Sequence, residues 1–141
     1  MGVEFTFPIE IKNEAGKDTY FENSNGYGSK RKYDSSGNET CFEDSNGYWR
    51  KREYNPSGKA TYCENSRGDW HKRKYDSSGN ETYFEDSNGY WHKSEHDTAG
   101  NETYYENSDG CKKGAPRSAK THEGKVVEVD GVKYELKTIN N

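Results

Sequence analysis

The sequence lacks aliphatic side chains over most of its length. From residue 12 to residue 113 there is no Val, Ile, Leu or Met, and hydrophobic residues make up only 27% of the 141 residues. Ordinary globular domains are about 45–50% apolar, so a conventional aliphatic core is excluded for this stretch. Its apolar content consists of 17 aromatic residues with a few Ala and Cys.

Long hydrophobic runs and targeting signals are also missing. No segment approaches the roughly 20 apolar residues of a membrane span, so we expect no membrane partner. The first residues have neither the basic nor the apolar region of a signal peptide, which predicts a cytoplasmic protein. A charged fraction of 33% with low hydrophobicity is typical of disorder. The aromatic fraction of 14% argues against disorder here.

Glycine reveals the organisation of the chain, because ten of the 15 glycines fall on two ladders with a period of 21. One ladder is Gly16, Gly37, Gly58, Gly79 and Gly100, and the other is Gly26, Gly47, Gly68, Gly89 and Gly110. They define five units, 12–32, 33–53, 54–74, 75–95 and 96–116. Three further columns are identical in all units: Thr19/40/61/82/103, Glu22/43/64/85/106 and Ser24/45/66/87/108. Such identity within one chain reports a repeated structural requirement.

Each unit contains two turns of one chemical type. Asp34-Ser-Ser-Gly37 and Asp44-Ser-Asn-Gly47 are examples, in which the Asx side chain accepts a backbone hydrogen bond two residues on and Gly adopts a positive φ. Short segments rich in Tyr, Phe, Trp and Thr separate the turns and favour strands. The sequence therefore predicts an all-β fold, an antiparallel meander of five 21-residue β-hairpin repeats in a single-layer or curled sheet.

The two ends differ from the repeats and hold every Val, Ile and Leu. Residues 1–11 alternate in polarity and predict a capping strand before the repeat domain, 12–116. Residues 117–141 predict a linker followed by a β-hairpin, because Asp130-Gly131 between alternating runs is typical of a type I′ turn. We expect this hairpin to cap the last unit, because an isolated hairpin is only marginally stable.

The odd period leaves the two faces of the sheet unassigned. If both turns had the same geometry, a period of 21 would move equivalent side chains to opposite faces in successive units. Either one turn carries a bulge that the other lacks, or a bulge within a strand absorbs the difference. The choice decides whether the Trp column shares a face with Phe42 and Phe84 or with Tyr62 and Tyr83.

The turn and strand motifs carry a resemblance to a known family. The pattern Y-D-x-x-G-N-x-T…D-x-x-G, repeated over about residues 12–113, resembles the YD repeats of Rhs and teneurin-type proteins. In that family such repeats form a spiralling β-sheet that encloses a toxin. The two-strand plan is also similar to MORN-type and choline-binding repeats, and it is closer to short YD-like repeat proteins of phages and bacteria. This resemblance implies a phage or bacterial origin and no particular activity.

The second strand of each unit supplies the candidate binding residues. Its motifs are YWRKRE, DWHKRK and YWHKSE, which place aromatic rings beside cations. Such strands can stack bases and contact phosphates, or the rings can pack while the cations pair with neighbouring Glu strands. The candidate partner-binding residues are Tyr48, Trp49, Arg50, Arg52, Trp70, His71, Arg73, Tyr90, Trp91 and His92.

No pattern indicates catalysis, a cofactor or a metal. The histidines form no ligand set and the three cysteines have no CxxC spacing. Any catalytic Glu of the repeated column would have four equivalents, whereas an active site needs an unlike constellation. A Cys41–Cys63 disulfide is an open alternative to free thiols, because neighbouring units bring these positions near each other.

These observations favour a small non-enzymatic protein-binding or inhibitor module. The resemblance suggests a phage-encoded protein that acts on a host protein, for example an inhibitor of a defence system of the CRISPR type. The alternative is a module that binds nucleic acid or a small ligand, such as a sugar or nucleotide, through the Trp-His/Arg-Lys strands. We expect a monomer or a homodimer paired through sheet edges.

Overall fold

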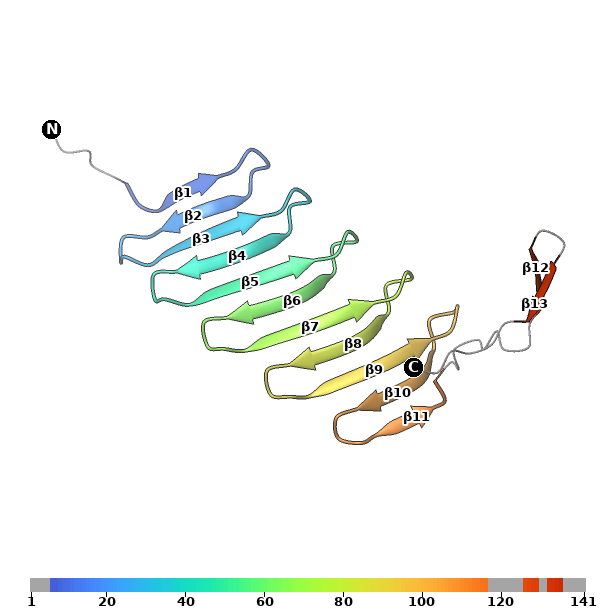
Figure 1. The fold of residues 1–141 in the computed structure, drawn as a ribbon. Coiled ribbons are helices and arrows are strands. Elements are labelled where there is room, and N and C mark those ends of the chain that lie inside the picture. The colour runs from blue at the N-terminus through green and yellow to red at the C-terminus, as the bar shows by residue number, and fades with distance from the viewer. Residues whose placement is uncertain (1–5, 117–125, 130–131, 136–141) are drawn as a thin grey trace.

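The computed structural model describes residues 6–116, 126–129 and 132–135, and within these residues the fold is all-β. Eleven antiparallel strands form one meander in chain order, and two more form a separate hairpin (Figure 1). The strands of the large sheet are β1 (Ile9–Lys12), β2 (Asp18–Glu22), β3 (Gly28–Tyr33), β4 (Glu39–Asp44), β5 (Trp49–Tyr54), β6 (Ala60–Asn65), β7 (Trp70–Tyr75), β8 (Glu81–Asp86), β9 (Trp91–His96), β10 (Glu102–Asn107) and β11 (Lys112–Gly114). The hairpin consists of β12 (Val126–Val129) and β13 (Val132–Glu135).

The predicted turn chemistry is confirmed at both turns of the unit. In the first turn, Asp34 Oδ1 accepts hydrogen bonds from the amides of Ser36 (2.9 Å) and Asn38 (2.8 Å). In the second, Asp44 Oδ1 accepts from the amides of Asn46 (2.9 Å) and Tyr48 (3.1 Å). All ten turn glycines have φ between 75° and 86°, a region that L side chains rarely adopt.

A bulge within a strand absorbs the odd period. The two turns close alike, since the Asp34 amide donates to Asn38 and the Asp44 amide to Tyr48, both at 2.9 Å. In the register of β3 with β4, however, Lys32 faces Cys41 whereas Tyr33 faces Glu39, so the Thr40 between them is an extra residue. The same shift occurs in every unit, at the repeated Thr column: Thr19, Thr40, Thr61, Thr82 and Thr103.

The bulge keeps equivalent side chains on one face throughout the sheet. Arg31 faces Phe42, and Phe42 faces Arg50, which is 19 positions beyond Arg31. Because the repeat advances by 21 positions, successive units are staggered by two residues, an even number that preserves the face. This register settles the open question of the Trp column. Trp49 faces Glu43 and therefore shares its face with Tyr62 and Tyr83.

The repeated Ser column joins each unit to the one before it. The Ser66 amide donates to the Trp49 carbonyl at 2.9 Å, while the Ser66 hydroxyl accepts from the Trp49 amide at 3.3 Å. The hydroxyls of Ser45 and Ser108 accept in the same way from the amides of Gly28 and Trp91. A Ser at this position therefore satisfies backbone groups of the neighbouring strand beyond the end of the ladder.

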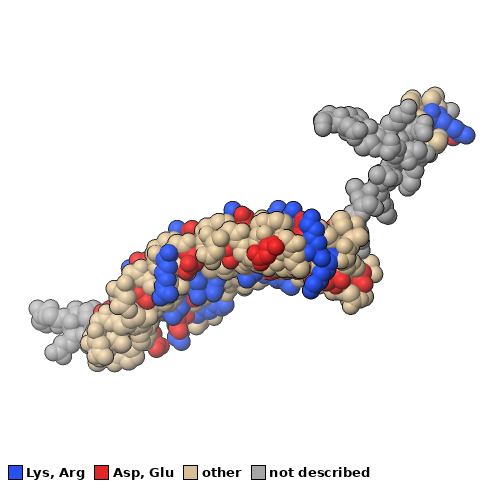
Figure 2. Space-filling view, turned by 90° about the horizontal axis from the view of Figure 1, so that it is seen from below, with Lys and Arg blue, Asp and Glu red and all other residues tan. Residues whose placement is uncertain are grey.

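The sheet is a single layer with no conventional core. None of the described hydrophobic side chains is buried, and Ser29 and Ser94 are the buried polar residues. Figure 2 shows the arched sheet, with basic and acidic side chains intermixed along it. Stability must therefore come from contacts between side chains of neighbouring strands, summed along the array.

A strand and a hairpin lie towards the two ends of the described chain. β1 pairs with β2 as the first strand of the sheet, and β12 pairs with β13 around positions 130–131, which lie outside the described residues. Whether the hairpin caps the last unit stays a prediction, as does the linker at 117–125, which also lies outside the described residues. The edge strands β1 and β11 have four and three residues, and short edges present few unpaired backbone groups.

Candidate functional site

The register divides the predicted binding residues between the two faces of the sheet. We call one the arginine face, because it carries every strand arginine: Arg31, Arg50, Arg52 and Arg73. We call the other the lysine face, because it carries the strand lysines of β3 to β9: Lys30, Lys32, Lys51, Lys72, Lys74 and Lys93. The arginine face holds Tyr48, Arg50, Arg52, His71, Arg73, Tyr90 and His92, and the lysine face holds Trp49, Trp70 and Trp91.

On the lysine face, each Trp lies beneath a lysine of its own strand. The ammonium groups of Lys51 and Lys72 lie 4.9 Å from the ring centroids of Trp49 and Trp70, and Lys93 lies 5.1 Å from that of Trp91. The lysines stay largely in solvent, with 61% of the Lys51 side chain exposed. Cation–π contacts at such exposed positions contribute about 0.5–1 kcal/mol each.

The repeated Glu column of the lysine face is held by tyrosines and lysines. The Glu106 carboxylate forms ion pairs with Lys93 (3.4 Å) and Lys112 (3.6 Å). Its hydrogen bond from Tyr104 is the main reason that the pKa of Glu106 is lowered, and the same bond raises the pKa of Tyr104. Acids and bases therefore alternate on this face and largely neutralise each other.

The arginine face is built from rings and guanidinium groups stacked across strands. Phe84 stacks on His92 at 5.4 Å and 14°, and on His71 at 6.0 Å and 22°. The guanidinium of Arg73 lies 5.2 Å from the Phe84 centroid, and His92 also stacks on Tyr105 at 5.6 Å. These contacts extend over four strands, β7 to β10, and half-bury the residues involved.

In the N-terminal half of the arginine face, Glu39 forms ion pairs with three arginines. Its carboxylate lies 2.7 Å from Arg50, 3.6 Å from Arg31 and 3.6 Å from Arg52. The Arg31 guanidinium also covers the Phe42 ring at 5.1 Å. The equivalent Glu81 pairs with Arg73 and His92, each at 3.0 Å.

The middle unit breaks this arrangement at two positions. Ala60 stands where the neighbouring units have Glu39 and Glu81, and Cys63 stands where they have Phe42 and Phe84. The residues equivalent to the cationic partners of Glu39 are nevertheless present around Ala60: Arg52, His71 and Arg73. Cys63 faces Arg52 on one side and His71 on the other. We call these five residues the cationic gap.

The positive charges of the cationic gap disfavour protonation of His71. Burial is the main cause of a lowered His71 pKa, and Arg73 and Arg52 lower the pKa further against smaller opposing effects of Glu81 and Asp86. The Nη1 atom of Arg73 lies 3.0 Å from Nε2 of His71, a contact that requires the neutral ring to accept. A carboxylate at position 60 would instead favour the protonated ring.

Two other expectations have clear outcomes. Cys41 lies on the lysine face and Cys63 on the arginine face, and both are free thiols, so the alternative of a Cys41–Cys63 disulfide is wrong. No helix long and apolar enough to cross a membrane occurs in the part of the chain that the structure describes.

Sequence reasoning missed Ala60 and Gly28, which depart from their columns rather than conform to them. Aligning the five units shows both departures, since Gly28 occupies the position of Trp49, Trp70 and Trp91. The consequence of each departure depends on which side chains share a face, and the face assignment depends on the bulge at the Thr column.

Comparisons with known proteins bear on the fold alone. No protein-family model matches the chain, and no curated protein matches its sequence. Among solved structures, the chain is similar to a component of the Tc holotoxin pore of Photorhabdus luminescens carrying the TccC3 mutation D651A, with a TM-score of 0.54 and 14% identity. The match covers 70% of this chain and 6% of the toxin chain.

This similarity supports the expected resemblance to YD repeats at the level of a repeated β-sheet. It does not extend to short phage proteins in particular. The expectations of a phage origin and of an inhibitory role stay predictions.

Proposed function

We propose that the chain is a small non-enzymatic protein-binding module that receives an acidic side chain of its partner at the cationic gap. The observation that carries the proposal is the Ala60 position, which holds a carboxylate in the two neighbouring units, while Arg52, His71 and Arg73 are the equivalents of the three cationic partners of Glu39. Arg52 and Arg73 each pair with a carboxylate of a neighbouring unit, Glu39 and Glu81, and none is supplied at position 60. A partner Asp or Glu would restore in trans the ion pairs that Glu39 and Glu81 make in cis.

The composition of the arginine face supports a protein partner. Arginine, tyrosine and phenylalanine are enriched at the centres of protein interfaces, whereas lysine and glutamate are depleted. The arginine face carries the strand arginines with Phe42 and Phe84, whereas the lysine face carries the strand lysines and the repeated Glu column beside its tryptophans. Because the described sheet has one layer, the face is not covered by other parts of the described chain.

A protein partner is favoured over nucleic acid by the charge distribution. Binding to phosphates depends on an extended positive footprint, but this chain has a net charge of −4 and its gap is flanked by Glu39 and Glu81. The tryptophans that would stack on bases lie on the opposite face from the arginines. Inhibition of a host protein, the role suggested by the family resemblance, remains one form of this proposal.

The test fills the gap from within the chain. In Ala60→Glu the new carboxylate takes the place that Glu39 has in its unit, so the fold should be retained while the acceptor site is occupied. The matched control is Asn46→Glu, which adds the same charge at an exposed turn position where other units already carry Arg67 and Asp109. The probe is a fluorescent decaglutamate peptide, followed by anisotropy at low and physiological salt.

We expect salt-sensitive peptide binding that weakens at least tenfold in Ala60→Glu and stays within twofold in Asn46→Glu. Equal binding by the two variants, or no binding to the parent chain at low salt, would contradict the proposal. A single-stranded DNA 10-mer serves as a second probe. Tighter binding of the DNA, lost in a Trp70→Ala/Arg73→Ala variant, would support the nucleic-acid alternative instead.

A further inference from the structure

The first unit lacks the tryptophan that the next three units place on the lysine face. Gly28 pairs with Glu22 in the register in which Trp49 pairs with Glu43. Its backbone is also held in the same way, since the Gly28 amide donates to Ser45 Oγ at 3.1 Å and the Trp49 amide to Ser66 Oγ at 3.3 Å. The backbone of a tryptophan position is therefore in place without the indole ring.

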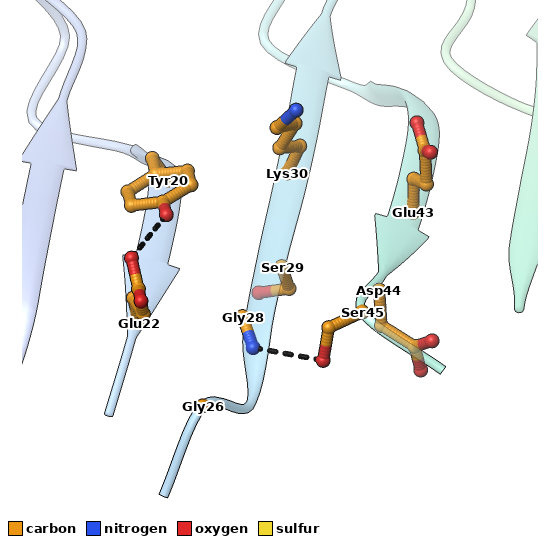
Figure 3. A pocket seen from close by; sticks show the side chains of 9 residues that line it. All are labelled: Tyr20, Glu22, Gly26, Gly28, Ser29, Lys30, Glu43, Asp44 and Ser45. Atoms are coloured by element: carbon orange, nitrogen blue, oxygen red, sulfur yellow. Dashed lines mark hydrogen bonds between the residues drawn. The ribbon is translucent and has the colours of Figure 1, made fainter. Parts of the chain in front are cut away.

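A depression of about 280 Å³ is lined by Gly28 itself and by its lysine-face neighbours Tyr20, Glu22, Lys30 and Glu43. Figure 3 shows Gly28 on the central strand, with the side chains of Tyr20 and Glu22 on one neighbouring strand and Glu43 on the other. The Tyr20 hydroxyl donates a hydrogen bond to Glu22 at 2.5 Å, which holds the Tyr20 side chain at one side of the depression. The volume is below the ~300–1,000 Å³ of pockets for drug-sized ligands, so it suits a single aromatic side chain.

The lysine that covers the ring in the other units is also present. Lys30 lies two residues beyond Gly28, as Lys51, Lys72 and Lys93 lie beyond their tryptophans, and it lines the depression. Its stem can cover an incoming ring and its ammonium can approach the ring face. We propose that the Gly28 depression is a binding site for an indole ring, supplied by a tryptophan side chain of a partner polypeptide.

The charges around the depression select the source of the ring. The carboxylates of Glu22 and Glu43 flank the site and disfavour aromatic ligands with a net negative charge, such as nucleotides and N-acetyltryptophan. A tryptophan within a peptide is neutral and meets no such repulsion. This inference concerns the lysine face and does not depend on the proposed role of the cationic gap.

The test uses N-acetyltryptophanamide, which presents the indole on neutral peptide groups, titrated into the ¹⁵N-labelled full chain. We expect saturable amide shift changes at millimolar concentration, centred on Gly28, Lys30 and Tyr20. Gly28→Trp should abolish them, because the ring is then supplied in cis. A Cβ at Gly28 would lie 3.2 Å from the Phe21 carbonyl oxygen, a tight contact. Lys30→Met therefore serves as a milder second variant, expected to weaken binding about two- to fivefold.

Controls separate ring recognition from general hydrophobic binding. N-acetylleucinamide should produce no saturable change, and N-acetyltryptophan, which carries a carboxylate and no ammonium group, should bind at least threefold more weakly than the amide. Trp70→Gly should create a second site, with new shift changes near Lys72 in the titration. The inference fails if shift changes persist in Gly28→Trp, if the leucine compound binds equally, or if the parent chain shows no change near Gly28.

Discussion

The arginine face and the lysine face both contain cation–aromatic contacts, but the cations are half-buried on the arginine face and solvent-exposed on the lysine face. On the arginine face, guanidinium groups stack on Phe rings and converge on Glu39 and Glu81, and the Arg side chains are about 30% exposed. On the lysine face, the ammonium groups lie over Trp rings but remain in solvent, with 54% of Lys93 exposed. A planar guanidinium can stack and bind a carboxylate at once, whereas an ammonium stays strongly hydrated.

This difference between the faces explains how a repeat region without aliphatic residues can form a single-layer sheet. One face forms a half-buried layer of rings and guanidinium groups, which takes the place of a core. The other face is covered by lysine stems and keeps its charges hydrated. The assignment of each side chain to its face therefore matters more to this fold than the amount of apolar surface.

Deleting Thr61 should mix the side chains of the two faces. The bulge is the single extra residue that keeps the faces aligned, so its loss puts β6 to β11 out of phase with β1 to β5. Trp70 and Trp91 would then lie on the same side as Arg50 and Arg52. We expect a loss of roughly 3 kcal/mol or more in the free energy of unfolding, or separate transitions for the two halves. Thermal and urea denaturation followed by circular dichroism would measure it.

The matched control removes the whole unit that contains this residue, 54–74. Although 20 more residues are lost, the phase of the remaining units is preserved, so the shortened chain should unfold in one transition with its dispersed amide spectrum retained. The loss of stability should be that of one repeat with its interface. A one-residue deletion that is tolerated better than the 21-residue deletion would refute the role of the bulge.

The turns could be predicted from sequence and the faces could not, for a physical reason. An Asx residue and a glycine three positions later specify a turn through local hydrogen bonds and a positive φ, as at Asp34 and Gly37. The bulge at Thr40 depends instead on the register between two strands, and no side chain within that strand dictates it alone. The sequence shows that Thr is identical in all five units, but it does not show that this Thr is the bulge residue.

The candidate site could also be predicted only in part, because its geometry depends on the register between strands. Trp49 and Arg50 are neighbours in sequence and lie on opposite faces, so the motif that suggested a joint aromatic and cationic site divides in the structure. Ala60 was visible as a departure from its column, but its significance required the partners of Glu39 to be known.

Truncating adjacent aromatic residues on the two faces should lower stability by unequal amounts. Phe84 on the arginine face contacts His71, His92 and Tyr90, whereas Tyr83 on the lysine face lies under Lys74 at 5.6 Å. We expect Phe84→Ala to lower the free energy of unfolding by about 2 kcal/mol and Tyr83→Ala by about 1 kcal/mol, both below the cost at fully buried sites. Urea denaturation of the two variants would measure the difference.

A conservative pair serves as the control for these truncations. Phe84→Tyr should be nearly neutral, because the equivalent Tyr105 already stacks on His92 in the last unit. If Tyr83→Ala costs as much as Phe84→Ala, the two faces contribute equally and the half-buried layer has no special part in stability.

The smallest expected effect is a pH dependence confined to the arginine face. Burial and the charges of Arg73 and Arg52 lower the pKa of His71 below its ordinary value of about 6.5. The unfolded chain then binds more protons than the folded chain in the range just below that value. The contribution to stability is therefore complete above pH 7 and is lost as the pH falls through the folded-state pKa. Histidine ring shifts in NMR titrations would report the His71 pKa directly. Arg73→Met should move it upward, and the equivalent change on the other face, Lys72→Met, should leave it in place. An unaltered His71 pKa in Arg73→Met would show that Arg73 does not contribute to it, and would contradict the electrostatic character assigned to the cationic gap.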